Sequence, residues 1–216
     1  MRLMNDEVAN QLRTLFNDIK TDVTIAFFTS EEGDCVSCEE THSLLHEVEE
    51  LSDKIHLAHY DIDKDNELAK AYNIEMVPSF VLLDHEGKNH GVKFNGIPAG
   101  HEINSFIPAL LEMGNAHEEE VPEDYLKRIN AINKPVNIKV FVTLSCPHCP
   151  GAVQKAHKLA MLNPNIEGEM VEAQTFFELS NRFNVSSVPK IVINDTVELL
   201  GNQPFDAFLE AIEQLP

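Results

Sequence analysis

The 216-residue sequence is poor in basic residues, with sixteen Lys and Arg against thirty-six Asp and Glu and a formal charge of −20 at pH 7. Such an excess repels phosphate backbones and anionic lipid headgroups, which disfavours nucleic acid and membrane surfaces as partners. Long apolar runs are missing, and the N-terminal segment lacks the apolar stretch and cleavage site of a signal peptide. We therefore expect a cytoplasmic protein that does not span a membrane.

Cysteine is scarce too, and its four copies form two Cys-x-x-Cys pairs, Cys35 with Cys38 and Cys146 with Cys149. So few cysteines exclude a disulfide-dense scaffold. Without an export signal, closely paired thiols are typical of redox-active or metal-binding centres rather than of structural disulfides.

An internal repeat relates the two halves of the chain at an offset of 111 residues. Pro78 and Pro189 each follow the first cysteine of their pair by 43 residues, and each is preceded by Val. The residues before them also match, since 72–74 read Tyr-Asn-Ile and 183–185 read Phe-Asn-Val. A duplicated unit is therefore expected.

Apolar periodicity predicts the same order of elements in both halves. In the first half we expect helices over 4–20, from Cys35, 65–72 and 102–113, and strands over 23–29, 55–62, 80–83 and 93–95. In the second half we expect helices over 123–132, from Cys146, 175–183 and 205–214, and strands over 136–143, 169–173, 190–194 and 197–200. This alternation indicates an α/β fold with a mixed central sheet flanked by helices in each half.

The acidic stretch over 114–122 separates the two halves and contains Glu118, Glu119 and Glu120. Such a stretch is typical of a solvated linker between domains. The predicted domains are residues 1–117 and 118–216.

The predicted position of each cysteine pair indicates its chemistry. The first cysteine is expected to begin a helix after a strand, and the second to lie one turn further on, facing the core. The positive end of a helix favours thiolate, so Cys35 and Cys146 should attack, and Cys38 and Cys149 should resolve the mixed disulfide. This arrangement predicts thiol–disulfide exchange.

Each half resembles the thioredoxin or glutaredoxin fold. The resemblance rests on a strand, a Cys-x-x-Cys at the start of a helix, and a Val-Pro that follows the first cysteine by 43 residues. Two such units, with the segments 94–102 and 140–150, resemble the glutaredoxin-like protein disulfide oxidoreductases of archaea and thermophilic bacteria. The resemblance covers the whole chain. It implies two tandem thioredoxin-like domains, sheets joined edge to edge, and protein thiols and disulfides as substrates.

The resemblance also implies roles for the cysteines. Cys146 would be the principal nucleophile, Cys149 its resolving partner, and Cys35 with Cys38 a second redox centre. Electrons would come from a thioredoxin-reductase-like flavoprotein. No bound cofactor or metal is expected, because the thiols are the redox groups.

The resemblance further assigns the Val-Pro segments to substrate binding. Pro78 and Pro189 would be cis and lie against the disulfides. The main chains of Val77 and Val188 would then pair with an extended substrate.

The two centres are expected to differ in acidity. Pro147 suits the first helical position, and His148 adds a donor or partial positive charge beside Cys146. Three carboxylates within 31–34 disfavour a thiolate at Cys35. Cys146–Cys149 should thus be the stronger oxidant, and Cys35–Cys38 should be able to pass electrons to it.

The proton acceptor for the resolving thiol is not evident, because the strands before the two pairs carry no acid in their interiors. Glu172, on a neighbouring strand, is a guess, and it could equally face outward from the sheet. His157 corresponds to His46 in the repeat, and we expect both to be surface residues.

Metal binding is the main alternative for the thiols. Both pairs together could form a four-sulfur zinc site, although 107 residues separate them. A local site from Cys35, Cys38, His42 and His46 is also conceivable, but solvated histidines fit the helical spacing better.

Two other functions remain open. The protein could be a dedicated electron relay to a peroxiredoxin-type partner, or a non-catalytic, thiol-regulated binding or chaperone module. The residues do not distinguish reductase, oxidase and isomerase.

Overall fold

The computed structural model describes residues 3–33, 35–116 and 120–216. In the first half, the elements are α1 (Asp6–Phe16), β1 (Val23–Thr29), α2 (Cys38–Glu49), β2 (Ile55–Asp61), α3 (Asn66–Ala71), β3 (Ser79–Leu83), β4 (Asn89–Asn95), the 3-10 helix η1 (Gly100–Glu102) and α4 (Ile103–Met113). In the second half, they are α5 (Glu123–Asn130), β5 (Val136–Val142), α6 (Cys149–Leu162), β6 (Ile166–Glu172), α7 (Phe177–Arg182), β7 (Lys190–Ile193), β8 (Val197–Leu200) and α8 (Phe205–Glu213). The predicted order of helices and strands and the α/β fold are confirmed.

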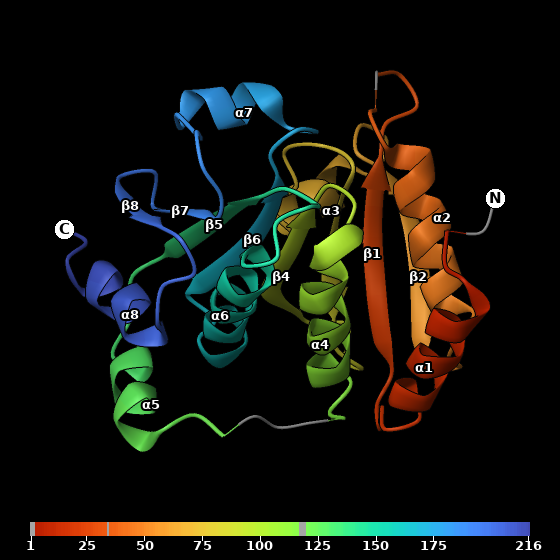
Figure 1. Cartoon of the computed structure of the whole chain (residues 1–216), viewed down its shortest axis with the longest axis horizontal. Coiled ribbons are helices and arrows are strands. Elements are labelled where there is room, and N and C mark those ends of the chain that lie inside the picture. Colours follow the sequence, from red (N-terminus) through yellow and green to blue (C-terminus); the bar gives the residue numbers. More distant parts are fainter. Residues whose placement is uncertain (1–2, 34, 117–119) are drawn as a thin grey trace.

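One eight-stranded sheet runs through both halves, in the order β2-β1-β3-β4-β6-β5-β7-β8 (Figure 1). Each half contributes four strands in the same relative order, so the sequence repeat is a translation along the sheet. The halves meet where β4 pairs with β6 in parallel, with Val92 opposite Gly168 and Asn95 opposite Val171. The expected edge-to-edge union of the two sheets is confirmed.

The pairing directions place both cysteine pairs at one edge of the sheet. β3 is antiparallel to both β1 and β4, while β4 is parallel to β6 and β6 to β5. β1 and β5 therefore run in the same direction, and the segments that follow them leave the sheet at the same edge.

The two faces of the sheet are covered differently. A large apolar core packs α1, α2, α4, α5, α6 and α8 against one face, through residues such as Phe27, Phe94 and Val140. Two small clusters cover the other face, one under α3 around Phe28 and one under α7 around Phe141. Alternating strand residues thus serve different cores, as expected for a sheet covered on both sides.

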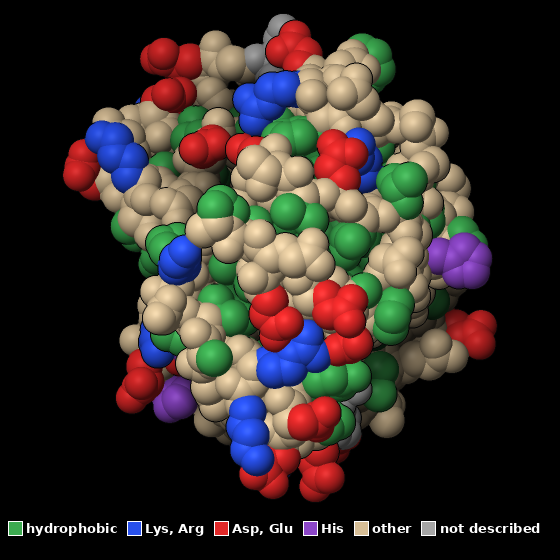
Figure 2. Space-filling view, turned by 90° about the vertical axis from the view of Figure 1, so that its left-hand side faces the viewer, with side chains coloured by type: hydrophobic (Ala, Val, Ile, Leu, Met, Phe, Trp, Pro, Cys, Tyr) green, Lys and Arg blue, Asp and Glu red, His purple; other side chains and the backbone are tan. Residues whose placement is uncertain are grey.

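Charged side chains hold the outer helices of the second half. Arg128 on α5 donates from Nε to Glu213 Oε1 on α8 at 2.6 Å and also pairs with Asp206. The face at this end of the molecule shows acidic and basic side chains side by side (Figure 2). Among the described residues, no helix has the length and apolarity needed to cross a bilayer.

The start of β4 differs from the prediction, and the predicted domain boundary lies in a segment that is only partly described. β4 begins at Asn89 rather than at residue 93, because the turn closes through Asp84, whose carboxylate accepts hydrogen bonds from the backbone of Glu86 and Lys88. Part of the acidic linker, including Glu118 and Glu119, lies outside the described residues. The domain boundary at 117/118 therefore stays a prediction.

Candidate active site

Each cysteine pair forms a disulfide, and the Cα atoms are 5.5 Å apart in both. The pairs follow β1 and β5, which are four strand positions apart, or about 19 Å at the usual strand spacing. This separation excludes a zinc ion shared by the four sulfurs. Transfer of electrons from Cys35–Cys38 to Cys146–Cys149 would need a carrier or a motion that brings the sulfurs together.

The first cysteine of each pair does not begin a helix, contrary to the prediction. α2 begins at Cys38 and α6 at Cys149, so Cys35 and Cys146 lie in the turns before them. The reason in the first site is Ser37, whose φ of 63° is left-handed and cannot continue a helix toward Cys35. Through its disulfide to Cys149, Cys146 remains at the positive end of α6.

The two sites differ in burial. Cys149 has no exposed surface and Cys146 is 8% exposed, whereas Cys35 and Cys38 are both half-buried. The predicted inward orientation of the second sulfur is therefore confirmed for Cys149, but Cys38 is less enclosed than expected. At the second site Cys146, the predicted nucleophile, is the more accessible member of the pair, as disulfide exchange requires.

Both Val-Pro bonds, Val77–Pro78 and Val188–Pro189, are cis, as the resemblance implies. The carbonyls of Pro78 and Pro189 accept hydrogen bonds from Gly96 and Gly201, each at 2.8 Å. The repeat thus extends to individual hydrogen bonds. Val188 packs against the core cluster that contains both cysteines of the second site, whereas Val77 packs under α3.

Pro147 and His148 are exposed in the turn between the cysteines of the second site. The expected position of Pro147 in the first turn of the helix is wrong, because α6 begins at Cys149; His148 is its N-cap residue but makes no side-chain cap hydrogen bond. Their side chains are thus at the surface that a docking protein would meet. Their effect on the Cys146 thiol stays a prediction.

Sequence reasoning missed Glu102, the last residue of η1. Its side chain has no exposed surface, and burial raises its pKa to about 7. Ser105 donates a hydrogen bond to Oε2, while Oε1 has no hydrogen-bond partner among the described residues. A buried carboxyl that titrates near neutral pH is suited to accepting and returning a proton.

Glu102 comes from the first half of the chain, but its helix η1 packs beside the segment that leads to the cysteines of the second half. The backbone N–H of His101 donates to the carbonyl of Leu144 at 2.9 Å, two residues before Cys146. η1 also packs against α6, which Cys149 begins. The approach requires Gly100, because its φ is +59° and a Cβ there would collide with the Leu144 carbonyl. A single acid before an apolar helix resembles an ordinary helix start, so only the tertiary structure reveals this site.

The outward orientation considered for Glu172 is wrong, whereas its role as proton acceptor stays a prediction. Glu172 is 3% exposed, and its oxygens accept hydrogen bonds from the backbone N–H and the hydroxyl of Thr175 at 2.6 and 2.7 Å. Asp61 has the same role in the first half, accepting from the backbone of Glu31 and Lys64. Both carboxylates hold the turn that follows a strand.

The prediction of a surface position is also wrong for His157. It is 2% exposed, its Nε2 lies 3.0 Å from the Lys93 carbonyl, and its ring packs on Phe94 at 4.6 Å. α6 is central and covered by α4, whereas α2 is near the end of the sheet, where the His46 side chain is 55% exposed. Burial lowers the pKa of His157 to about 4.

Two histidines, His42 on α2 and His59 on β2, lie close together in the first half. The His42 ring lies 5.2 Å from that of His59 and 6.1 Å from that of Phe27. The described ranges contain no group of three His, Cys, Asp or Glu residues arranged to hold a metal. The local metal site considered from the sequence is therefore not formed there.

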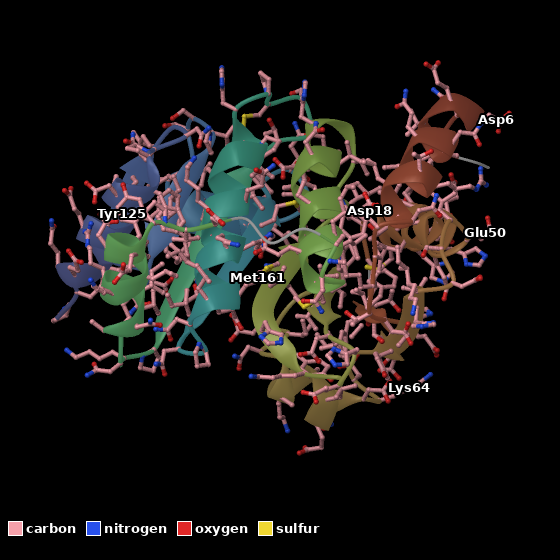
Figure 3. The ribbon with its side chains drawn as sticks, turned by 90° about the horizontal axis from the view of Figure 1, so that it is seen from below. Asp6, Asp18, Glu50, Lys64, Tyr125 and Met161 are labelled. Carbon is pink, nitrogen blue, oxygen red and sulfur yellow. A yellow bond between two sulfur atoms is a disulfide. The ribbon has the colours of Figure 1, made fainter. Side chains whose placement is uncertain are left out.

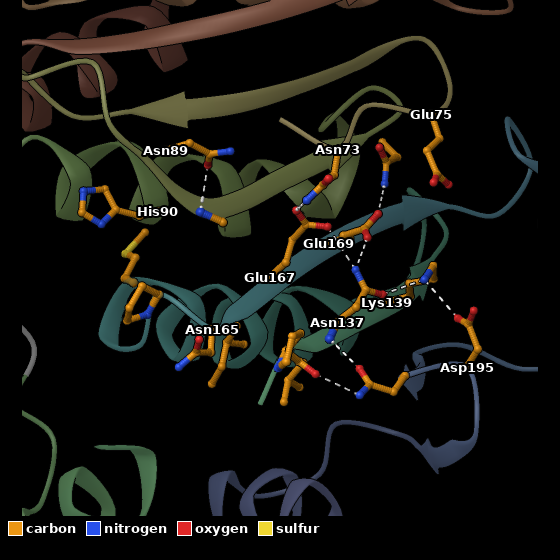
Figure 4. A pocket seen from close by; sticks show the side chains of 18 of the residues that line it. Asn73, Glu75, Asn89, His90, Asn137, Lys139, Asn165, Glu167, Glu169 and Asp195 are labelled. Carbon is orange, nitrogen blue, oxygen red and sulfur yellow. Dashed lines mark hydrogen bonds and ion pairs between the residues drawn. The ribbon is translucent and has the colours of Figure 1, made fainter. Parts of the chain in front are cut away.

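A polar cavity of about 1040 Å³ opens on the sheet face that carries α3 and α7 (Figure 4). Its walls hold the two halves together, because Lys93 on β4 binds Glu167 at 2.9 Å and Asn95 donates to Glu169 at 2.7 Å. None of its lining residues belongs to a cysteine pair. We therefore interpret the polar side chains of this cavity as contacts that join the two halves, and not as part of the cysteine sites.

Residues 6–109 match the Thioredoxin family, and residues 136–214 match the Thioredoxin domain family. Over 97% of its length, the chain is 32% identical to the NTD_N/C domain of alkylhydroperoxide reductase AhpF from Enterococcus faecalis; 99% of that domain is covered, with a TM-score of 0.89. The chain belongs to the thioredoxin family, with two thioredoxin domains in tandem. A protein disulfide oxidoreductase from Aeropyrum pernix is 26% identical, with coverages of 97% and 92% and a TM-score of 0.88.

The alkyl hydroperoxide reductase AhpF of Staphylococcus epidermidis is 30% identical over 193 residues, which are 89% of this chain and 34% of that protein. The chain thus spans about a third of the length of the curated relatives it matches. The chemistry of its two Cys-x-x-Cys pairs is thiol–disulfide exchange, and the tandem thioredoxin protein is a thiol–disulfide oxidoreductase.

Proposed function

We propose that this tandem thioredoxin protein transfers electrons to protein disulfides, with Cys146 and Cys149 as its principal exchange centre. The observation that carries the proposal is the second site itself. A fully buried resolving cysteine begins the helix against which η1 packs, and η1 carries the buried Glu102, whose pKa burial raises to about 7. The first pair, Cys35 and Cys38, has no comparable acid among its described neighbours and serves as a second redox centre.

The exchange proceeds in two substitutions at sulfur. The thiolate of Cys146 attacks a substrate disulfide, forms a mixed disulfide with one sulfur and releases the other as a thiolate, which takes a proton from solvent. Cys149 then gives its proton to Glu102 and attacks the Cys146 sulfur. The Cys146–Cys149 disulfide forms, and the second substrate sulfur leaves as a thiolate. Two electrons pass to the substrate.

The substrate segment would lie extended beside the cis proline. The main chain of Val188, before Pro189, is the proposed partner for its backbone at the second site, and Val77 before Pro78 at the first. Main-chain pairing of this kind accepts many side chains. It therefore suits a protein with several disulfide substrates.

A thioredoxin-reductase-like flavoprotein is the proposed electron donor. The likeness to the alkyl hydroperoxide reductase AhpF supports a narrower candidate, in which the chain relays electrons to a single peroxiredoxin-type partner. The likeness to the Aeropyrum oxidoreductase supports the broader one. Equilibration of each pair with a glutathione buffer would give its potential and hence the direction of electron flow.

Insulin reduction by dithiothreitol tests the general activity. We expect turnover that Cys146→Ser abolishes. Reduction of a peroxiredoxin disulfide without reduction of insulin would support the dedicated relay. Suppression of aggregation with no turnover of either substrate would indicate a binding module and contradict the proposal.

A further inference from the structure

Three aromatic rings form a cluster between α2 and the sheet in the first half. Phe27 and His59 are paired in register on the parallel strands β1 and β2, and their ring centroids are 5.4 Å apart. The His42 ring comes from α2 and lies 6.1 Å from the Phe27 ring and 5.2 Å from the His59 ring. Because Phe27 has no exposed surface, its contact with His42 shows that this imidazole is turned toward the sheet.

The helix brings the same imidazole to the resolving cysteine. Cys38 is the first residue of α2, and His42 follows it by four residues. Residues four apart on an α-helix lie on one face, with Cβ atoms about 5–6 Å apart. Helical side chains also lean toward the N-terminal end of their helix, so the His42 ring is directed at the turn that contains Cys38. This geometry places the ring within reach of the Cys38 sulfur.

The second half has no imidazole at the equivalent positions. In the repeat, Val153 corresponds to His42 and Met170 to His59, and both are fully buried in the apolar core. The buried acid of that half is Glu102, which has no counterpart in the first half because β2 is the outermost strand of the described sheet. The two sites therefore offer different proton-accepting groups to their resolving thiols.

We propose that His42 accepts the proton of Cys38 during disulfide exchange at the first pair. The inference rests on the proposed role of Cys35 and Cys38 as a second redox centre. The Cys38 thiol gives its proton to the imidazole, and its sulfur attacks the Cys35 sulfur of the mixed disulfide. The Cys35–Cys38 disulfide forms, the partner's sulfur leaves as a thiolate, and two electrons have then passed from the pair to the partner disulfide.

His59 positions the accepting ring and prevents both imidazoles from holding protons together. Its Nε2 lies 2.8 Å from the hydroxyl of Thr29, which fixes its orientation. Burial lowers the pKa of His59, and the charge of His42 lowers it further. The other titratable groups around the two rings are Glu31, Glu39, His46, Glu49 and Asp61.

The accepted proton has a short way to solvent. α2 and β2 form the end of the molecule where Glu50, the C-cap residue of α2, and Lys64, which follows β2, lie at the outer side (Figure 3). The His42 side chain is half-buried and His59 is exposed. The imidazolium can therefore return its proton to water after each exchange.

The test uses the full-length protein with Cys146→Ser and Cys149→Ser, in which only the first pair reacts. Ellman's reagent forms a mixed disulfide with the reduced pair, and the second phase of thionitrobenzoate release reports the attack of Cys38. In His42→Gln this phase should slow about tenfold at pH 7 and keep rising at higher pH, because only the Cys38 thiolate then attacks. His46→Gln, one turn further along α2 and 55% exposed, is the control and should keep the parent rate and profile.

Chemical rescue separates proton transfer from a structural role. Added imidazole should restore part of the rate in His42→Ala and leave His46→Ala unchanged. A parent profile in His42→Gln, or a slow His42→Ala that imidazole does not restore, would overturn the role of His42 alone. A parent protein whose first pair forms no mixed disulfide would contradict the second redox centre itself, and this inference with it.

Discussion

The two cysteine pairs have the same local fold but different surroundings. Around the second pair, Cys149 is fully buried, and η1 of the other half, which carries the buried Glu102, packs against the helix that Cys149 begins. Around the first pair, both cysteines are half-buried. The acidic residues nearest to this pair in the described sequence, Glu31, Glu32, Glu39 and Glu40, are all exposed.

The difference arises because the two halves are related by a translation along one continuous sheet. The segment after β4 reaches α6 because β6 lies next to β4. In the first half, β2 is the outermost strand of the described sheet, so the strand order places no equivalent segment beside Cys38. Duplication therefore gives two copies of the thiol pair but only one interdomain site. The chemistry of the second site depends on this junction.

Removing one cysteine pair at a time should change activity more than any other substitution, and the loss should differ between the two pairs. We expect Cys146→Ser with Cys149→Ser to abolish turnover of protein disulfides, because this pair has the buried acid. Cys35→Ser with Cys38→Ser should retain most of it. Insulin reduction with both double variants gives the comparison, and equal losses would show that the two pairs act only in series.

Glu102→Gln should stabilise the protein at alkaline pH. Because the pKa of Glu102 is raised on folding from 4.5 to about 7, the folded state holds the proton more tightly and loses stability as pH rises between these values. The variant should gain about 3 kcal/mol over wild type at pH 8 and nothing at pH 4. Urea unfolding at both pH values measures the difference. A constant difference at the two pH values would contradict the raised pKa.

Gly100→Ala should damage the second site and spare the first. A Cβ at φ +59° would strain the backbone and collide with the Leu144 carbonyl, at a cost of about 1–3 kcal/mol. Thermal unfolding reports the stability. Alkylation of Cys146 and Cys35, each in a background that lacks the other pair, reports the sites. Equal changes in the alkylation of Cys146 and Cys35 would contradict an effect of η1 on the second site alone.

Glu31→Gln with Glu32→Gln should have the smallest effect. Removing two exposed charges should move the alkylation profile of Cys35 toward lower pH by less than about one unit, partly because Lys64 already pairs with Glu31. About 1 M salt should remove the shift, and Cys146 should not respond. A shift that persists in high salt would not be electrostatic.

Much of the fold could be predicted from local and periodic features. The repeat of Cys35 and Cys146, the two Val-Pro segments and the apolar spacing predict the order of elements and the tandem architecture. The helix starts could not be predicted as well, because the left-handed Ser37 is a local conformation that many residues adopt in turns.

The second site was only half predictable. Its cysteines are recognisable by their spacing, but Glu102 reaches them through the pairing of β4 with β6, which follows from no local pattern. The wrong prediction for His157 has a related reason. A residue equivalent in the repeat to the exposed His46 becomes buried when a second half packs over its helix.

The pH dependence of Cys149 attack tests directly whether the second site uses Glu102, an acid from the other half of the chain. The rate of Cys149 attack on a Cys146 mixed disulfide can be followed by stopped flow from about pH 5 to 9 in wild type and in Glu102→Gln. We predict an inflection near pH 7 in wild type, which the variant loses together with about 10²-fold in rate at pH 8. An unchanged profile and rate in Glu102→Gln would contradict the claim.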